Sequence, residues 1–207
     1  FKNFGSKNLL NRKIYSILET TNKEVFLGTN KGIYKLFNDT KSQISIDLVS
    51  NSSNVFVQDL LIGNNNNFLI ATKHSGILEY SFKTKVINSF MPKSDFKDAN
   101  LNVRRLLYDN DNNLWVGTYN GLKIINTTKR VITLKSNFNN TNSLTKNSIK
   151  SIFKDKKGSI WIGTYYGGLN VWDKSNVNFE NITENQNHLG LNYSVVSSMA
   201  HYNDDVF

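Results

Sequence analysis

The sequence contains no cysteine, one proline and three histidines in 207 residues. Without cysteine, the chain forms neither a disulfide framework nor a thiolate metal site. A single proline argues against a disordered tail or a linker, because such segments are rich in proline. The histidines, His74, His188 and His201, have no HxH or HxxxH spacing. We therefore predict no metal site, no cofactor and no catalytic residue in this region.

Long apolar runs and dense basic blocks are also absent from the sequence. No run approaches the roughly 20 apolar residues that a membrane-spanning helix needs. The net charge of +9 is spread over the whole sequence, and no segment has a helical period that would place a helix in a nucleic-acid groove. We therefore predict that this region contacts no nucleic acid. An acidic ligand, such as an anionic polysaccharide fragment, matches the charge better.

A repeat of about 46 residues organises the sequence. Each copy has an apolar residue that opens one β-rich run and, 15 residues later, a threonine that closes the next run. The threonines, spaced by 43, 46 and 46 residues, are Thr29, Thr72, Thr118 and Thr164. The opening residues, spaced by 43, 46, 46 and 46 residues, are Ile14, Val57, Val103, Ile149 and Val195. A fixed period of this length indicates a solenoid, a propeller or an array.

Four short β-rich runs, separated by turn residues, fit into each complete copy. Four antiparallel strands per repeat are typical of a propeller blade. The second run is apolar at consecutive positions, as expected for a strand that neighbouring blades cover on both faces. We predict an all-β fold, a β-propeller with four complete four-stranded blades and partial blades at both ends. It would occupy residues 1–207, with repeats starting near 14, 57, 103, 149 and 195 and no second domain.

The second run of each copy combines a large residue three positions before the threonine with a small residue directly before it. The large residues are Phe26, Leu69, Trp115 and Trp161, and the small ones are Gly28, Ala71, Gly117 and Gly163. We interpret the large residues as wedges between blades and the small ones as points of close approach. Trp115, Trp161 and Trp172 are therefore predicted to pack inside the fold rather than to form a sugar platform.

The segment Asp109–Asn113 (DNDNN) begins like a calcium-binding loop. Its sixth position is Leu114, where such a loop needs glycine, and its twelfth is Asn120, where it needs a bidentate glutamate. The same place in the next copy is a plain turn, Asp155–Gly158. We therefore predict a hairpin turn without metal.

The turn after each repeated threonine is the best candidate for ligand binding. Strand alternation places it at the same end as the connections between blades, and loops on a rigid scaffold commonly hold ligands. Tyrosine rings can stack on sugars, and asparagine and lysine can hydrogen-bond to hydroxyl groups. The alternative is that each of these side chains is merely an exposed turn residue, with His74 a solvated loop histidine. The candidates are Asn30, Lys31, Lys73, His74, Tyr119, Asn120, Tyr165 and Tyr166.

Two stretches, LWVGT at Leu114–Thr118 and IWIGTYYGGLN at Ile160–Asn170, resemble the two-component regulator propeller repeats. The lead-in NSL at Asn142–Leu144 matches the same family pattern. The resemblance extends over essentially the whole chain. The second copy departs most, because FLIAT at Phe68–Thr72 lacks both the tryptophan and the glycine.

The resemblance implies a ligand-sensing propeller on the periplasmic side of the inner membrane, part of a membrane-anchored hybrid two-component sensor histidine kinase and response regulator. The ligand would be an oligosaccharide released from a polysaccharide, and the full receptor would be a homodimer. This region itself is then not an enzyme, and the rest of the receptor chain carries the kinase and the transcriptional response. The chain starts at Phe1 and stops where the fifth copy enters its second run, so we expect a piece of a longer polypeptide.

Two alternatives stay open on the sequence alone, because a fold does not determine a function. A protein-interaction or dimerisation scaffold would show a flat patch and no small-molecule pocket. A polysaccharide lyase-type propeller would need histidine, tyrosine and acidic residues gathered at the propeller axis, for which the sequence offers little material.

Overall fold

The structure is a computed structural model that describes residues 9, 11–38, 44–63, 67–91, 102–172, 178–184, 191–202 and 205–206. The described residues form β-strands and turns and contain no α-helix. Within this part of the chain, no helix has the length and apolarity needed to span a bilayer. The predicted all-β class is confirmed.

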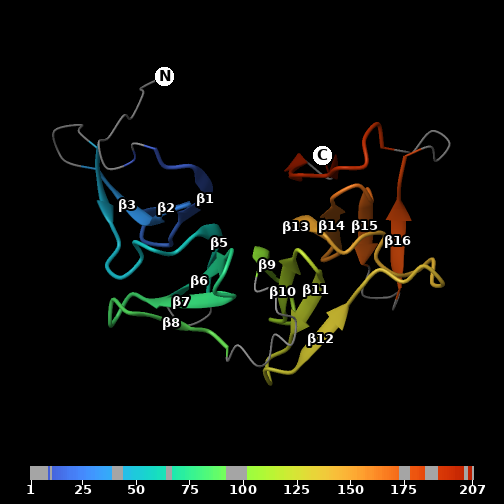
Figure 1. The fold of residues 1–207 in the computed structure, drawn as a ribbon, viewed down its shortest axis with the longest axis horizontal. Helices are drawn as coiled ribbons and strands as arrows, with labels where there is room; N and C mark the ends of the chain where they lie inside the picture. Colours follow the sequence, from blue (N-terminus) through green and yellow to red (C-terminus); the bar gives the residue numbers. More distant parts are fainter. Residues whose placement is uncertain are drawn as a thin grey trace. The chain divides into compact units, whose positions relative to one another are not determined.

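Four antiparallel sheets of four strands each follow the sequence order (Figure 1). Blade 1 contains β1 (Ile14–Glu19), β2 (Val25–Thr29), β3 (Gly32–Asn38) and β4 (Ile44–Leu48). Blade 2 contains β5 (Val57–Ile62), β6 (Asn67–Thr72), β7 (Ile77–Ser81) and β8 (Ile87–Ser89). Blade 3 contains β9 (Val103–Tyr108), β10 (Leu114–Thr118), β11 (Gly121–Ile125) and β12 (Val131–Leu134). Blade 4 contains β13 (Ile149–Lys154), β14 (Ile160–Thr164), β15 (Leu169–Trp172) and β16 (Phe179–Ile182).

These sheets are the propeller blades that the repeat predicts. Every first strand begins at the predicted opening residue, and every second strand ends at the predicted threonine. The blades divide between two compact units, unit 1 (Phe1–Asn102) with blades 1 and 2 and unit 2 (Val103–Phe207) with blades 3 and 4. A single domain over residues 1–207 stays a prediction.

The structure describes the two predicted partial blades only in part. Val195–Met199 does not form the expected first strand, although Gly168 N donates to Ser194 O (2.8 Å) and holds this segment against blade 4. A short hairpin of β17 (His201–Tyr202) and β18 (Asp205–Val206) follows instead. The expected N-terminal partial blade falls almost entirely outside the described residues.

The repeated threonine has matching surroundings in all four blades. Its side chain is buried, with 0–3% exposure. The hydroxyl donates to the carbonyl oxygen of the glycine that follows in the turn, at 2.7–3.0 Å. In three blades the same oxygen accepts a backbone N–H from the turn. The hydroxyl thus holds together the turn between the second and third strands.

We expect Thr118→Val to lower the free energy of unfolding by about 1–3 kcal/mol, because valine keeps the shape and leaves buried backbone groups unpaired. The lost bonds are those from Thr118 Oγ1 to Gly121 O (2.7 Å) and from Asn120 N to Thr118 Oγ1 (3.0 Å). Urea unfolding of the full chain measures the effect. Thr141→Val, at an exposed position, is the matched control and should stay within about 0.5 kcal/mol of the parent. Equal losses of stability in both variants would contradict the role of the Thr118 hydroxyl in holding the turn together.

Neighbouring blades within a unit approach each other at the small residue before the threonine. In blades 1, 3 and 4 a Cβ atom added to this glycine would come closer than 3.0 Å to a residue at the start of the next repeat, so only glycine fits there without a shift. The three contacts are Gly28 with Val57 Cγ1 (2.6 Å), Gly117 with Ile149 Cγ2 (2.7 Å) and Gly163 with Val196 Cβ (2.8 Å). The interpretation as points of close approach is confirmed for Gly28, Gly117 and Gly163 and stays a prediction for Ala71.

The opening residue of β1 differs from its equivalents in exposure. Val57, Val103 and Ile149 are 0% exposed, whereas Ile14 is 48% exposed and Ile17, on the same strand, is 69% exposed. The buried Val57 and Ile149 are the ones that contact a glycine of the preceding blade in their own unit. In blade 1, the surface that is buried in blades 2 and 4 is therefore exposed.

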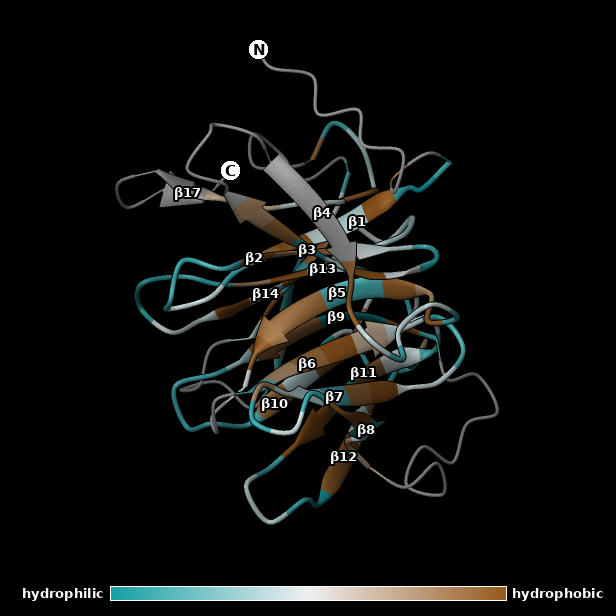
Figure 2. Cartoon of the chain, turned by 90° about the vertical axis from the view of Figure 1, so that its left-hand side faces the viewer, coloured by the Kyte–Doolittle hydropathy of each residue, from teal (hydrophilic) through white to brown (hydrophobic). Residues whose placement is uncertain are grey.

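Each unit has its own apolar core, and Figure 2 shows the hydrophobic colour concentrated in the strands while most turns are hydrophilic. In unit 2, Trp115 is 3% exposed, and its ring lies 6.0 Å from that of Trp172. Trp172 lies in turn 5.1 Å from Phe179. Trp161, at the equivalent place in blade 4, is half-buried. These positions are consistent with packing rather than with an exposed sugar platform.

Candidate ligand-binding site

Each first strand carries a β-bulge directly after its opening residue. The pairing register with the second strand skips one residue at this point in all four blades. A bulge leaves the extra residue outside the ladder and redirects its side chain. The four bulge residues are Tyr15, Gln58, Arg104 and Lys150.

In unit 2 the bulge side chains reach the turn after the repeated threonine. The guanidinium carbon of Arg104 lies 5.0 Å from the ring centroid of Tyr119. One blade later, Lys150 Nζ lies 4.9 Å from the ring centroid of Tyr165. Both distances are within the range of a cation–π contact. We call these four residues the cationic tyrosine cluster.

Ser148 joins the two halves of this cluster. Arg104 Nη1 donates to Ser148 Oγ (2.9 Å) and to Ile149 O (3.2 Å), which connects blade 3 to the start of blade 4. Tyr165 N donates to Ser148 O at 2.9 Å. Arg104 and Tyr165 are therefore attached to the same serine, and the cluster is one continuous surface within unit 2.

The electrostatics of the cluster are set by two cations without a carboxylate. Among the described residues, neither Arg104 nor Lys150 forms an ion pair. Burial lowers the pKa of Arg104, as does the charge of Arg105, while Tyr119 and Tyr165 act in the opposite direction. The pKa of Tyr165 is raised, first by its hydrogen bond with Tyr166, and Lys150 and Arg104 oppose this shift.

In unit 1 the same end of the blades, at the bulges, carries mainly aromatic side chains. The Phe56 ring lies 5.2 Å from that of Tyr15 and 6.4 Å from that of His74. Lys73 Nζ lies 5.0 Å from the centroid of the same ring. We call Tyr15, Phe56, Lys73 and His74 the Phe56 cluster. Its bulge residues are Tyr15 and Gln58, so it lacks the two cations of unit 2.

The eight candidates from the sequence take different roles in the structure. Tyr119, Tyr165 and Tyr166 are 52%, 40% and 64% exposed and lie at the cationic tyrosine cluster. Lys73 and His74 join the Phe56 cluster, and Lys31 is exposed. The other two candidates have bonds inside the fold: Asn30 Oδ1 accepts from Lys13 N (2.8 Å) and Asn120 N donates to Thr118 Oγ1. A binding role for any of them stays a prediction.

Sequence reasoning missed the bulge residues and Phe56. The available signal was positional, since Tyr15, Gln58, Arg104 and Lys150 each follow an opening residue. Their side chains share no chemistry, so the pattern of residue types does not reveal the position.

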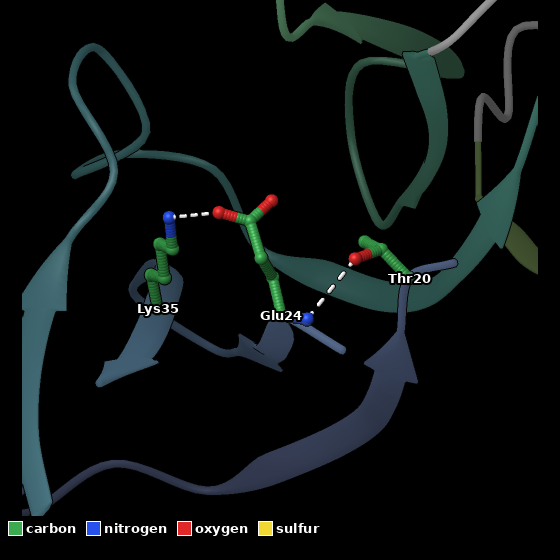
Figure 3. A network of polar contacts seen from close by, with 3 residues as sticks. All are labelled: Thr20, Glu24 and Lys35. Carbon is green, nitrogen blue, oxygen red and sulfur yellow. Dashed lines mark hydrogen bonds and ion pairs between the residues drawn. The ribbon is translucent and has the colours of Figure 1, made fainter. Parts of the chain in front are cut away.

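A hollow of about 410 Å³ lies at the opposite end of unit 1, beside the turns between first and second strands. Figure 3 shows three residues of this end. Thr20 Oγ1 accepts from Glu24 N at 3.1 Å, and Lys35 Nζ forms an ion pair with Glu24. These three groups therefore bond to one another at this end of unit 1.

A second hollow, of about 320 Å³, lies at the same end of unit 2 and is lined in part by Asp109, Trp115 and Trp172. Asp109 accepts from Trp115 Nε1 (2.8 Å) and from the backbone and amide nitrogens of Asn113. Burial alone would raise the pKa of Asp109, but these bonds, with that from Asp111 N, lower it overall. Blade 4 repeats the arrangement, with Trp161 Nε1 donating to Asp155 Oδ2 at 2.9 Å.

These contacts identify Asp109–Asn113 as a hairpin turn, as predicted. The carboxylate oxygens of Asp109 accept bonds from Asp111 and Asn113 in the turn and from Trp115 in β10, and Asp109 N donates to Asn113 O at 3.0 Å. Within the described ranges, no three residues among histidine, aspartate and glutamate come together as a set of metal ligands.

Two segments of the chain match a known family profile. The two-component regulator propeller profile matches residues 98–120 and 143–166, which include the first two strands of blades 3 and 4. Histidine kinase P4 of Formosa agariphila is 38% identical over 200 residues, covering 93% of this chain and 14% of the relative. The chain therefore spans about a seventh of that protein.

Several solved structures have the same fold. The extracellular domain of a hybrid two-component system from B. thetaiotaomicron superposes with a TM-score of 0.71 at 23% identity, covering 91% of this chain and 24% of that one. A second such domain from the same organism gives 0.68 at 20% identity, with the same coverage. Virginiamycin B lyase from Staphylococcus aureus gives 0.57 at 15% identity, covering 82% and 55%. At these identities the likeness shows the β-propeller fold alone.

Proposed function

Since the chain carries two-component regulator propeller repeats, we propose that it is the ligand-sensing propeller region of a hybrid two-component sensor histidine kinase. Support comes from its 38% identity to a histidine kinase and from neighbours that are extracellular domains of two-component systems. On this proposal the region lies on the periplasmic side of the inner membrane, in a membrane-anchored receptor. The matched residues belong to the propeller repeats, so the region is not itself the enzyme.

The ligand of the proposed sensor is an oligosaccharide, held at the bulge end of the blades. The observation that carries this proposal is the gathering of exposed tyrosine rings and unpaired cations in the cationic tyrosine cluster. Aromatic faces stack on sugar rings, and the polar groups beside them bond to sugar substituents. A ligand changes the output only if it binds the signalling state more tightly than the resting state. The full receptor is proposed to be a homodimer.

Isothermal calorimetry of the full chain against pools of neutral and acidic oligosaccharides tests the proposal. We expect saturable binding of at least one pool, weakened at least about fivefold by Tyr165→Ala, because loss of one stacked ring removes on the order of 1 kcal/mol. Ile132→Ala, at the hollow of unit 2, is the control and should leave the affinity unchanged. Flat titrations with all pools would contradict the proposal, and a loss confined to Ile132→Ala would move the site to the hollow.

A further inference from the structure

We propose that the cationic tyrosine cluster binds an acidic oligosaccharide, with Arg104 and Lys150 contacting carboxylate or sulfate groups and the tyrosine rings contacting the sugar. This inference rests on the proposed function, because it names the chemical class of ligand for the same end of the blades. It is carried by the contacts of Arg104, the position of Lys150 and the contrast with unit 1.

Arg104 is held in place by neutral acceptors. Its Nη1 atom donates to Ser148 Oγ and Ile149 O, and no bond to a described residue occupies its Nε and Nη2 atoms. The open edge of a guanidinium presents two parallel N–H groups that match the two oxygens of a carboxylate or sulfate group. Arg104 thus offers a fixed donor pair for an oxyanion.

The charge of Arg104 is also poorly compensated. The side chain is half-buried, and burial is the main cause of its lowered pKa. An arginine remains protonated at neutral pH despite such a shift. A positive charge that has lost part of its water and has no carboxylate beside it attracts an anion more strongly than a fully solvated charge does.

Lys150 places a second cation beside the first. It occupies the equivalent bulge position one blade later, and it contacts Tyr165 as Arg104 contacts Tyr119. Both cations act on the pKa of Tyr165, so their fields overlap at that ring. Two cations flanked by two rings suit a ligand that carries acidic groups on an apolar sugar face, rather than a small free anion.

Unit 1 supplies the internal contrast for this inference. The same bulge positions there hold Tyr15 and Gln58, which carry no charge. The Phe56 cluster retains rings and Lys73, and the arginine at this end of unit 1, Arg12, donates from Nε to Tyr34 Oη (3.1 Å) and does not occupy a bulge position. The repeat therefore does not require cations at this position, and their presence in unit 2 is a property of that site.

Calorimetry of the full chain with four probes tests the proposal: oligogalacturonates, sulfated galactan oligosaccharides, neutral cello-oligosaccharides and sodium sulfate. We expect one of the acidic oligosaccharides to bind, with Arg104→Gln lowering its affinity at least tenfold and reducing the salt dependence of binding. Lys157→Gln, an exposed turn residue at the opposite end, removes the same charge and should leave the affinity within twofold. If Arg104→Gln lowers the melting temperature markedly, Lys150→Gln provides the same test.

The possible outcomes separate this inference from the proposed function. Binding of cello-oligosaccharides as tight as that of the acidic probes would overturn the acidic ligand and leave the sensor proposal standing. Sulfate binding as tight as that of a sulfated oligosaccharide, and insensitive to Tyr165→Ala, would reduce the cluster to a simple anion site and overturn the inference. The absence of binding by every oligosaccharide would overturn both proposals.

Discussion

Phe68→Ala is expected to lower the free energy of unfolding by about 3–5 kcal/mol, the range for removing a fully buried ring. Phe68 is 0% exposed and lies in the core of unit 1. Its ring centroid is 4.8 Å from that of Tyr80, 5.1 Å from that of Phe26 and 5.5 Å from that of Phe82. Alanine would leave three rings facing a cavity that the paired sheets cannot close.

Urea unfolding followed by circular dichroism measures this effect in the full chain. Phe138→Ala is the matched control, because Phe138 is fully exposed and its truncation should change stability by less than about 0.5 kcal/mol. A loss below about 1 kcal/mol for Phe68→Ala would mean that the aromatic core of unit 1 is not closely packed.

Asp109→Ala is expected to lower the free energy of unfolding by about 2–4 kcal/mol at neutral pH. The substitution removes the acceptor of four bonds, from Asp111 N, Asn113 N, Asn113 Nδ2 and Trp115 Nε1, each at 2.8–2.9 Å. Bonds to a charged group are worth more than neutral ones, and a buried donor left without a partner adds a penalty. The indole N–H of Trp115 is such a donor, since this side chain is 3% exposed.

The same carboxylate predicts a pH dependence. The pKa of Asp109 is lower in the folded chain than its ordinary value, so the folded state favours the ionised form. Its stabilising contribution is therefore fully present above the ordinary aspartate pKa of about 4 and is lost as the pH falls through the lower, folded-state pKa. Asp109→Asn should remove this part of the acid sensitivity. Parallel losses of stability in the parent and Asp109→Asn between about pH 4 and pH 2 would contradict the assignment.

The blade boundaries could be predicted from the sequence because two landmarks repeat together. Ile149 and Thr164, for example, are paired across β13 and β14, and the same pair occurs in every blade. Each landmark has a structural role. Within a unit, the opening residue packs against the preceding blade, and the threonine holds the turn between the second and third strands. Because the same role recurs in each blade, the same type of residue recurs, and the repeat can be seen in the sequence.

The candidate site was predictable only in part. Tyr119 and Tyr165 follow the landmark threonine and could be found, but the bulge that directs Arg104 and Lys150 toward them leaves no mark in the residue pattern. A bulge depends on the backbone register, which a hydrophobic pattern does not specify.

The bond between Asp109 and Trp115 left a signal that the sequence reasoning did not use. Copies with a tryptophan in the second strand have an aspartate six residues earlier, as in Asp155 and Trp161. Copies with Phe26 or Leu69 have Thr20 or Gly63 at that position. The aspartate is needed where an indole N–H must be satisfied and not elsewhere.

The contact between glycine and opening residue gives the blades of a pair two different sides. One side presents the glycine, as at Gly117, and the other presents the residue that fits against it, as at Ile149. Such an interface is heterologous, and a side cannot mate with a copy of itself. An ancestral array could therefore lengthen by duplication of one blade, because each added blade brings both sides of the interface.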